Sequence, residues 1–319
     1  MRFFLYFCSV KRKFLQILLW LGIMAFLTAI AMIGWMIASG GAQTTQSLKW
    51  LQFVQTMATF LLPPILCATL WDRDHQPLRW LGLQRGADWR LFLLAIAIMI
   101  VAIPGINLLA DWNSQVKLPH SLAYLEEIFR RQEAAAAALT ERFLQADNIG
   151  ALLINIGLMA LLPAVAEELS FRGTLQQILS NSDSGLTGAA GLTSNRRSRS
   201  AVAIWATAIL FSAIHMQFYG FVPRMLMGAM FGYLFVWTGS LWIPMLMHFT
   251  NNGLAVLAYY FTSDTEKSIA DTIGAGDTWW LGVLSLVITS LGLLIFYRRT
   301  HKPGSSCGCG YPIDAEQES

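Results

Sequence analysis

Long uncharged segments alternate with shorter polar ones along almost the whole chain. Each long segment reaches or approaches the roughly 20 apolar residues that one helix needs to cross a bilayer. Segments of this length, without the alternation of a surface strand, predict membrane-spanning helices. We therefore predict an all-α fold, a polytopic transmembrane bundle of eight spans. The uncharged segments are Phe14–Ala38, Trp50–Trp71, Leu91–Ala110, Ile149–Ala166, Ala201–Ile214, Leu241–Phe261 and Thr278–Tyr297, and the eighth segment, Phe221–Gly239, contains a single charge.

Lys and Arg are distributed unevenly between the two sides of these segments. With the N-terminus inside, the inner segments hold fourteen of them and the outer segments hold six. Cytoplasmic loops of membrane proteins are enriched in Lys and Arg, so we expect both termini to be cytoplasmic. In a bacterium the protein would lie in the cell (cytoplasmic) membrane. The first apolar segment exceeds the roughly 7–15 residues of a signal peptide, which favours a retained helix.

The composition agrees with a bilayer as the surrounding solvent. Hydrophobic residues make up 55% of the 319 residues and charged residues 13%, where a soluble domain would have about 25% charged. Positive inner loops explain the net charge of +3, so we expect no nucleic-acid partner. The oligomeric state is left open. The cysteines fall on the inner side or within a span, so no disulfide framework is expected; they are Cys8, Cys67, Cys307 and Cys309.

Residues 1–302 are predicted to form a single transmembrane domain. Within the outer segment 112–148, helically spaced apolar residues predict an amphipathic helix at about 121–146. We interpret it as a surface helix, and a lid over a binding site is the alternative. The Gly/Ser-rich segment 181–200 is predicted to be a flexible inner loop, and 303–319 a disordered cytoplasmic tail. The two thiols of that tail, Cys307 and Cys309, are too few for a structural metal site.

Several ionisable or strongly polar residues lie within the predicted spans. Each charged one costs about 2.5–3.5 kcal/mol on insertion scales, so it must be paired or used. Glu168 and Arg172 are four residues apart in the favourable order for a helical ion pair. Glu167 lies about 100° further round that helix and needs a partner from another helix. The remaining ones are His215, Arg224, His248 and Asn252, of which we interpret Arg224 as an interfacial residue that snorkels to the membrane surface.

Depth in the membrane gives a second expectation. At 1.5 Å per residue, Glu167 should lie near the inner end of its span and His248 toward the inner side. Residues 201–239 must cross twice, which leaves little chain for an outer turn. We therefore expect the turn at 217–223 to be submerged, which draws His215 toward mid-depth. Irregular backbone at that depth needs cover from protein or a cavity, so we predict a polar cavity open to the inner side.

Three short motifs follow one another in the second half of the chain. They are "EELSFR" at 167–172, "FSAIH" at 211–215 and "HFTNN" at 248–252. In this order, on successive parts of a polytopic chain, they resemble the motifs of the CPBP family, the CAAX-processing and bacteriocin-processing intramembrane proteases, also called Abi proteins. The resemblance covers a motif-bearing core at about 149–261.

The resemblance implies an intramembrane endopeptidase that acts on a protein or peptide substrate at the membrane. It implies that Glu167 activates water and that His215 helps to hold it, while His248 and Asn252 stabilise the oxyanion. Glu168, Arg172 and Phe211 would be supporting residues.

We expect no cofactor at this site. The zinc-peptidase motif H-E-x-x-H is absent. Glu167, His215 and His248 could together form a zinc set with one open position. We favour a metal-free site, because Asn252 is a poor zinc ligand and a good oxyanion donor.

The residues themselves agree with hydrolysis but leave other readings open. Peptide hydrolysis needs a base, a positioned water and donors aimed at the developing oxyanion. The same carboxylate and imidazoles could serve as a proton relay in a transporter, although we find no inverted repeat of the kind typical of that class. Alternatively, the chain is a non-catalytic membrane partner on the same scaffold, with the polar residues bonding between helices.

Overall fold

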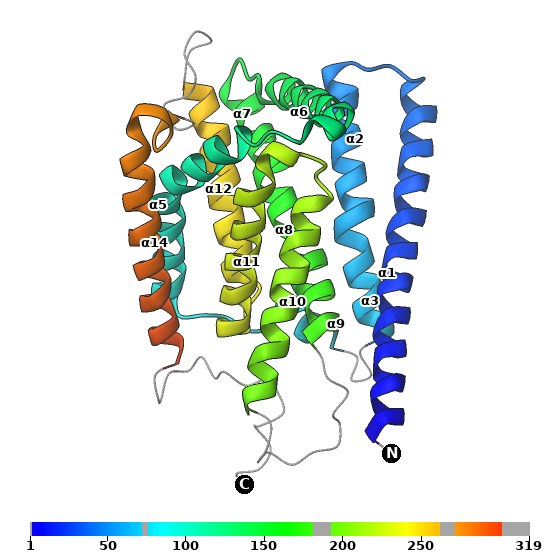
Figure 1. The fold of residues 1–319 in the computed structure, drawn as a ribbon. Helices are drawn as coiled ribbons and strands as arrows, with labels where there is room; N and C mark the ends of the chain where they lie inside the picture. Colours follow the sequence, from blue (N-terminus) through cyan, green and yellow to red (C-terminus); the bar gives the residue numbers. More distant parts are fainter. Residues whose placement is uncertain (1, 72–75, 181–192, 262–271, 302–319) are drawn as a thin grey trace.

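The computed structural model describes residues 2–71, 76–180, 193–261 and 272–301 (Figure 1). These residues form helices and connecting turns without a strand, which confirms the predicted all-α polytopic bundle. Their helices are α1 (Arg2–Ser39), α2 (Thr45–Thr56), α3 (Leu62–Trp71), α4 (Pro77–Trp80), α5 (Trp89–Ser114), α6 (Ala123–Leu144), α7 (Ile149–Asn155), α8 (Leu162–Ser170), α9 (Gln177–Ser180), α10 (Thr193–Ala213), α11 (Phe221–Thr238), α12 (Trp242–Phe261) and α14 (Trp279–Thr300).

Short helical segments of other types complete the list. The π-helical segment η1 joins α2 to α3, and η3 and η4 join α7, α8 and α9 into one long helix. The bounds are η1 (Met57–Leu61), η2 (His120–Leu122), η3 (Ile156–Leu161), η4 (Phe171–Gln176), η5 (Phe218–Gly220) and η6 (Gly276–Thr278).

Six helical segments of the described chain are long and apolar enough to cross a membrane. α10 and α12 run beside them in the bundle (Figure 1). The apolar part of α10 is the shorter stretch Ser200–Ala213, and α12 contains polar residues that lower its hydropathy. The count of eight spans therefore stays a prediction. So does the cytoplasmic placement of the termini, although α1 begins and α14 ends at the same end of the bundle.

The fourth predicted span is longer than the sequence indicated. Its helix runs unbroken from Ile149 to Ser180, 32 residues in all. Glu167 lies eighteen residues after its start and thirteen before its end, so it stands in the middle part of this helix. Its expected depth near the inner end of a span stays a prediction. The helix continues because its polar residues are bonded within the bundle. Glu168 pairs with Arg172, and the side-chain amide of Gln176 donates to the carbonyl of Gly232.

The predicted inner loop at 181–200 is also shorter than expected. α10 begins at Thr193, so the last part of that segment is helical. Residues 181–192 and the predicted tail at 303–319 lie outside the described residues.

The amphipathic outer helix α6 lies across one end of the bundle, over η5 (Figure 1). Phe129 stacks on Phe218 with ring centroids 5.2 Å apart, and the guanidinium of Arg130 lies 4.6 Å from the ring centre of Tyr219. The Tyr219 N–H donates to Glu133 at 3.3 Å. α6 therefore covers the turn that follows α10.

A second contact fixes the start of α6. Glu126 accepts hydrogen bonds from the side chain of Arg130 and from the Leu118 N–H, and both hold the pKa of Glu126 below its usual value.

The helices that hold the site are supported by a core between α5, α11, α12 and α14. α5 and α14 approach closely at Gly105 and Gly282, where an added Cβ would lie 2.7 Å from Leu286 and 2.6 Å from Leu108. Small residues of this kind allow helix backbones to pack tightly in a membrane. The core residues are Leu91, Ala95, Ile98, Met99, Ala102, Phe231, Leu234, Ile243, Met247 and Phe296.

Candidate active site

The centre of the site is a buried ion pair at the junction of α8 and η4. Arg172 Nη1 donates to Glu168 Oε1 at 2.7 Å, and both side chains are fully buried. Arg172 Nη2 donates to the Gly228 carbonyl of α11 at 2.9 Å. The guanidinium also lies 4.7 Å from the ring centre of Phe211 and 5.4 Å from that of Phe231. The expected helical spacing thus produces the pair, and α10 and α11 enclose it.

His248 of α12 meets the same carboxylate from the other side. Its Nδ1 lies 2.9 Å from Glu168 Oε1, and its ring stacks on Phe231 at 5.6 Å between centroids and 26° between planes. Glu168 is held by the cation of Arg172 and acts as the acceptor, so Nδ1 of His248 is the donor. This hydrogen bond fixes the tautomer and leaves Nε2 on the opposite edge of the ring.

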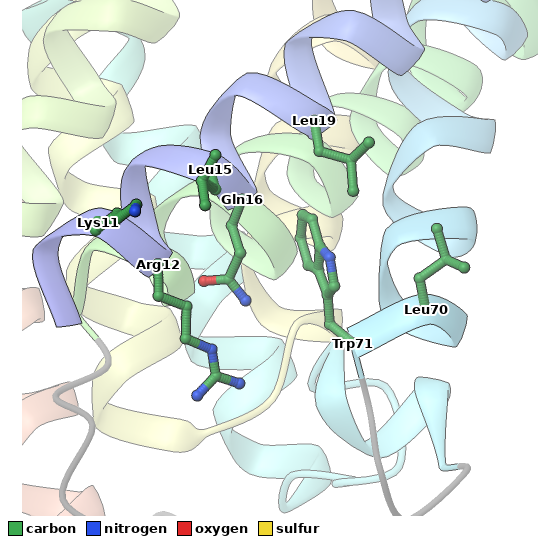
Figure 2. Close-up of a pocket in the computed structure, with 7 residues that line it drawn as sticks. All are labelled: Lys11, Arg12, Leu15, Gln16, Leu19, Leu70 and Trp71. Atoms are coloured by element: carbon green, nitrogen blue, oxygen red, sulfur yellow. The ribbon is translucent and has the colours of Figure 1, made fainter. Parts of the chain in front are cut away.

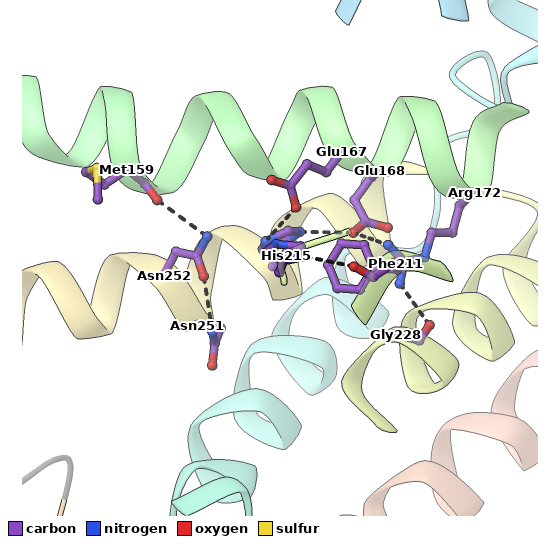
Figure 3. A network of polar contacts seen from close by, with 10 residues as sticks. Met159, Glu167, Glu168, Arg172, Phe211, His215, Gly228, Asn251 and Asn252 are labelled. Carbon is purple, nitrogen blue, oxygen red and sulfur yellow. Dashed lines mark hydrogen bonds and ion pairs between the residues drawn. The ribbon is translucent and has the colours of Figure 1, made fainter. Parts of the chain in front are cut away.

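Glu167 lies next to that free edge of the imidazole. Its Oε2 is 3.9 Å from His248 Nε2, and 13% of its side chain is exposed (Figure 3). The separation exceeds hydrogen-bond length, so the two groups face each other without bonding directly. The partner from another helix that Glu167 requires is therefore His248 of α12, at the distance of an ion pair.

His215 enters the site from the turn after α10. Its Nδ1 donates to the carbonyl of Phe211 at 2.7 Å, because a carbonyl can only accept. The ring packs edge-on against Phe211 at 5.1 Å, and Phe211 also packs edge-on against His248 at 6.1 Å. Phe211 thus brings the two imidazoles together. The next residue, Met216, has a φ of 54°, a left-handed conformation that is strained for a methionine.

Asn252 stands one helical turn beyond His248 on α12. Its Nδ2 donates to the Met159 carbonyl at 3.4 Å, and its Oδ1 accepts from Asn251 at 3.1 Å. Within the described residues, no hydrogen bond or ion pair joins it to Glu167, His215 or His248. Figure 3 shows it toward Met159 of η3, apart from the group around Phe211. Six of the seven predicted residues therefore gather closely, and Asn252 lies at the edge.

α11 contributes to the site in a way that was not predicted from the sequence. Gly228 accepts from Arg172 and Phe231 stacks on His248, so this face of α11 lines the site. Arg224 occupies the same face, one turn before Gly228. Its Nη2 donates to Gln217, and its Nη1 is buried without a hydrogen-bond partner among the described residues. The interpretation of Arg224 as a snorkelling surface residue was therefore wrong. Its i, i+4, i+7 spacing to Gly228 and Phe231 was the sequence pattern that could have placed it on the same helix face.

A groove of about 470 Å³ lies elsewhere, between α1 and α3 (Figure 2). It contains none of the predicted site residues, so it is not the polar cavity that the depth argument predicted. Its lining is Lys11, Arg12, Leu15, Gln16, Leu19, Leu70 and Trp71.

Three side chains of the site have the donor chemistry of a zinc site. Glu167, His215 and His248 offer a carboxylate and two imidazole Nε2 atoms, and both Nδ1 atoms are held by acceptors, as in many zinc sites. Across the described part of the chain, however, no three such side chains are gathered closely enough to hold an ion. That the site works without a metal stays a prediction.

Comparison with known proteins agrees with this geometry. Residues 149–254 match the family model described as Type II CAAX prenyl endopeptidase Rce1-like. No match was found among curated proteins or among solved structures. The matched segment contains all three motifs and the α11 residues that line the site, and it confirms the predicted resemblance to the CPBP/CAAX proteases. The segment that holds this site thus matches the Rce1-like family model and is similar to the CPBP/CAAX proteases, and its apolar helices indicate an integral membrane protein.

Proposed function

We propose that the protein is an intramembrane endopeptidase that hydrolyses a peptide bond of a membrane-associated protein or peptide. The observation that carries the proposal is the line of groups from Arg172 through Glu168 and His248 to Glu167. It holds an imidazole edge and a second carboxylate 3.9 Å apart in a nearly dry environment. A carboxylate and an imidazole held opposite each other are suited to bind and deprotonate a water molecule.

In the proposed reaction Glu167 is the general base. It takes a proton from water as the water oxygen attacks the carbonyl carbon of the scissile bond. The carbonyl becomes a tetrahedral oxyanion, the C–N bond then breaks, and the proton passes from Glu167 to the leaving amine. His215 orients the water through its Nε2, because its Nδ1 is already committed to the Phe211 carbonyl.

The role of oxyanion donor falls to His248 and Asn252. Because Nδ1 of His248 donates to Glu168, its Nε2 can donate only when the ring is the imidazolium. Glu168 and Glu167 are the two carboxylates that would stabilise this cation. Asn252 would supply its amide by giving up the long 3.4 Å bond to Met159. Donors aimed at an oxyanion are typically worth about 2.7–4 kcal/mol each.

The matched family supplies a first hypothesis for the substrate class. Its description names a CAAX prenyl endopeptidase, so a prenylated peptide is the first substrate to test. No observation on the site favours a transporter over a peptidase.

Membrane proteomics tests the proposal directly. Membranes containing the wild-type protein or Glu167→Gln would be compared for peptides cut only by the wild type. Peptide ends that appear with both proteins, or with neither across a prenylated and an unprenylated substrate set, would refute the proposed activity.

A further inference from the structure

Arg224 is the one cation on the site-facing side of α11, counted over the described residues. The residues that follow it at helical spacing, Gly228 and Phe231, contact Arg172 and His248 respectively. Residues at i, i+4 and i+7 share one face of a helix. Arg224 therefore lies on the face of α11 that lines the site, one helical turn closer to η5 than Gly228. It is near enough to Glu167 for the two charges to interact.

The guanidinium is held in place but is only half satisfied. Nη2 donates to Gln217, in the turn between His215 and η5. Gly220 makes room for the group, since a Cβ there would lie 3.1 Å from Nη2. Nη1 is buried and has no hydrogen-bond partner within the described residues. A buried charged donor without a partner is destabilising, so such an atom calls for a function.

Building on the proposed peptidase function, we propose that Arg224 Nη1 binds a backbone carbonyl oxygen of the substrate, on the η5 side of the scissile bond. The neighbouring charges decide between a carbonyl and a carboxylate. Arg224 already interacts with Glu133 of α6 and with Glu167, two carboxylates against one guanidinium. A third carboxylate would add repulsion, whereas a neutral carbonyl adds none. Arg224 is thereby a substrate-binding residue that recognises extended peptide backbone irrespective of side chain.

Steady-state kinetics on the intact protein in detergent or liposomes tests this assignment. Arg224→Met removes the donor, and Arg224→Lys keeps a charge and a donor. Arg131→Met is the matched control, because Arg131 lies on the exposed face of α6 and pairs with Glu127 of the same helix. Loss of a hydrogen bond to a charged group typically corresponds to about a 10- to 100-fold change in binding. We expect Arg224→Met to raise KM by that factor, with kcat within threefold of the wild-type value. Arg224→Lys should show a smaller rise in KM, and Arg131→Met should have the KM and kcat of the wild type.

Two further arms make each result decisive. Arg224→Met should raise KM by the same factor for a peptide with a free C-terminal carboxylate and for the same peptide with an amidated C-terminus. A rise in KM that occurs only with the free acid would show that Arg224 binds a carboxylate and not a carbonyl. An unchanged KM with both peptides would show that Arg224 does not contact the substrate. Binding of a fluorescent peptide to Glu167→Gln, with and without Arg224→Met, repeats the comparison without turnover. If the wild type cuts no peptide, the proposed function fails; if it cuts and Arg224→Met has the wild-type KM, only the present inference fails.

Discussion

His248 and Glu168 are joined by a buried hydrogen bond of 2.9 Å from Nδ1 to Oε1. The same oxygen accepts from Arg172 at 2.7 Å, while Glu168 Oε2 has no hydrogen-bond partner in the described structure. One carboxylate oxygen thus connects the ion pair of η4 with the imidazole of α12. Glu168 consequently both compensates the arginine and orients the histidine, a second role that helical spacing alone did not reveal.

Glu167→Gln should abolish turnover while leaving the fold intact. The amide has the shape of the carboxylate but cannot take a proton, and general-base catalysis typically contributes about 10²–10⁴-fold. Glu167 makes no hydrogen bond to His248, so little structure depends on its charge. Peptide cleavage and the melting temperature in detergent would be measured together. Retained cleavage by Glu167→Gln would mean that the base is another residue.

Glu168→Gln should lower stability as well as activity. Arg172 would remain fully buried without its counter-charge, and breaking a buried pair typically costs about 3–5 kcal/mol. His248 would also lose its orienting acceptor. We expect a lower yield and a clearly lower melting temperature than for Glu167→Gln, which serves as the matched control. A Glu168→Gln protein that melts like the wild type would contradict its structural role, and if it also does not cut while Glu167→Gln still does, the roles of the two glutamates are exchanged.

Removal of metal should leave the activity unchanged. The prediction rests on the missing H-E-x-x-H motif and on Asn252 as a donor in preference to a ligand. Purified protein would be treated with a strong chelator, assayed for cleavage and then supplied with zinc. Activity that disappears and returns with one equivalent of zinc would place Glu167, His215 and His248 in ligand roles, and elemental analysis of the purified protein gives an independent check.

Topology can be tested with two introduced cysteines. Ala137 on α6 and Arg299 at the end of α14 are both exposed, and the Lys and Arg distribution puts them on opposite sides of the membrane. In a variant without native cysteines, Ala137→Cys should react with an impermeant thiol reagent on intact cells. Arg299→Cys should react only after the membrane is opened. The reverse labelling would invert the predicted orientation.

Gly282→Ala should destabilise the seam between α5 and α14. An added Cβ would lie 2.6 Å from Leu108 Cβ and 2.7 Å from the Gly274 carbonyl, neither of which is the end of a flexible side chain. Overpacking of this kind typically costs about 1–3 kcal/mol. Gly34→Ala in α1 is the control, because a Cβ there meets nothing within 4 Å. Equal melting temperatures for the two variants would show that α5 and α14 can move apart to accommodate the added methyl group.

The sequence by itself determined the fold class and most of the site. Apolar segments of bilayer length are a local property, and so is the four-residue spacing that pairs Glu168 with Arg172. The order of the three motifs pointed to the family that the comparison then matched. Each of these inferences depends on residues close together in the chain, which is why they could be drawn without a structure.

Only the tertiary structure decided how the helices share their polar groups. The span through Glu167 continues to Ser180 because Arg172 and Gln176 bond to α11, a compensation between helices that local hydropathy does not contain. His248 meets Glu168 across eighty residues of sequence. The sequence likewise indicated that Arg224 is a surface residue, whereas the packing of α11 places it beside the site. In a medium without water, a polar group's effect depends on which helix supplies its partner, and that is fixed by packing.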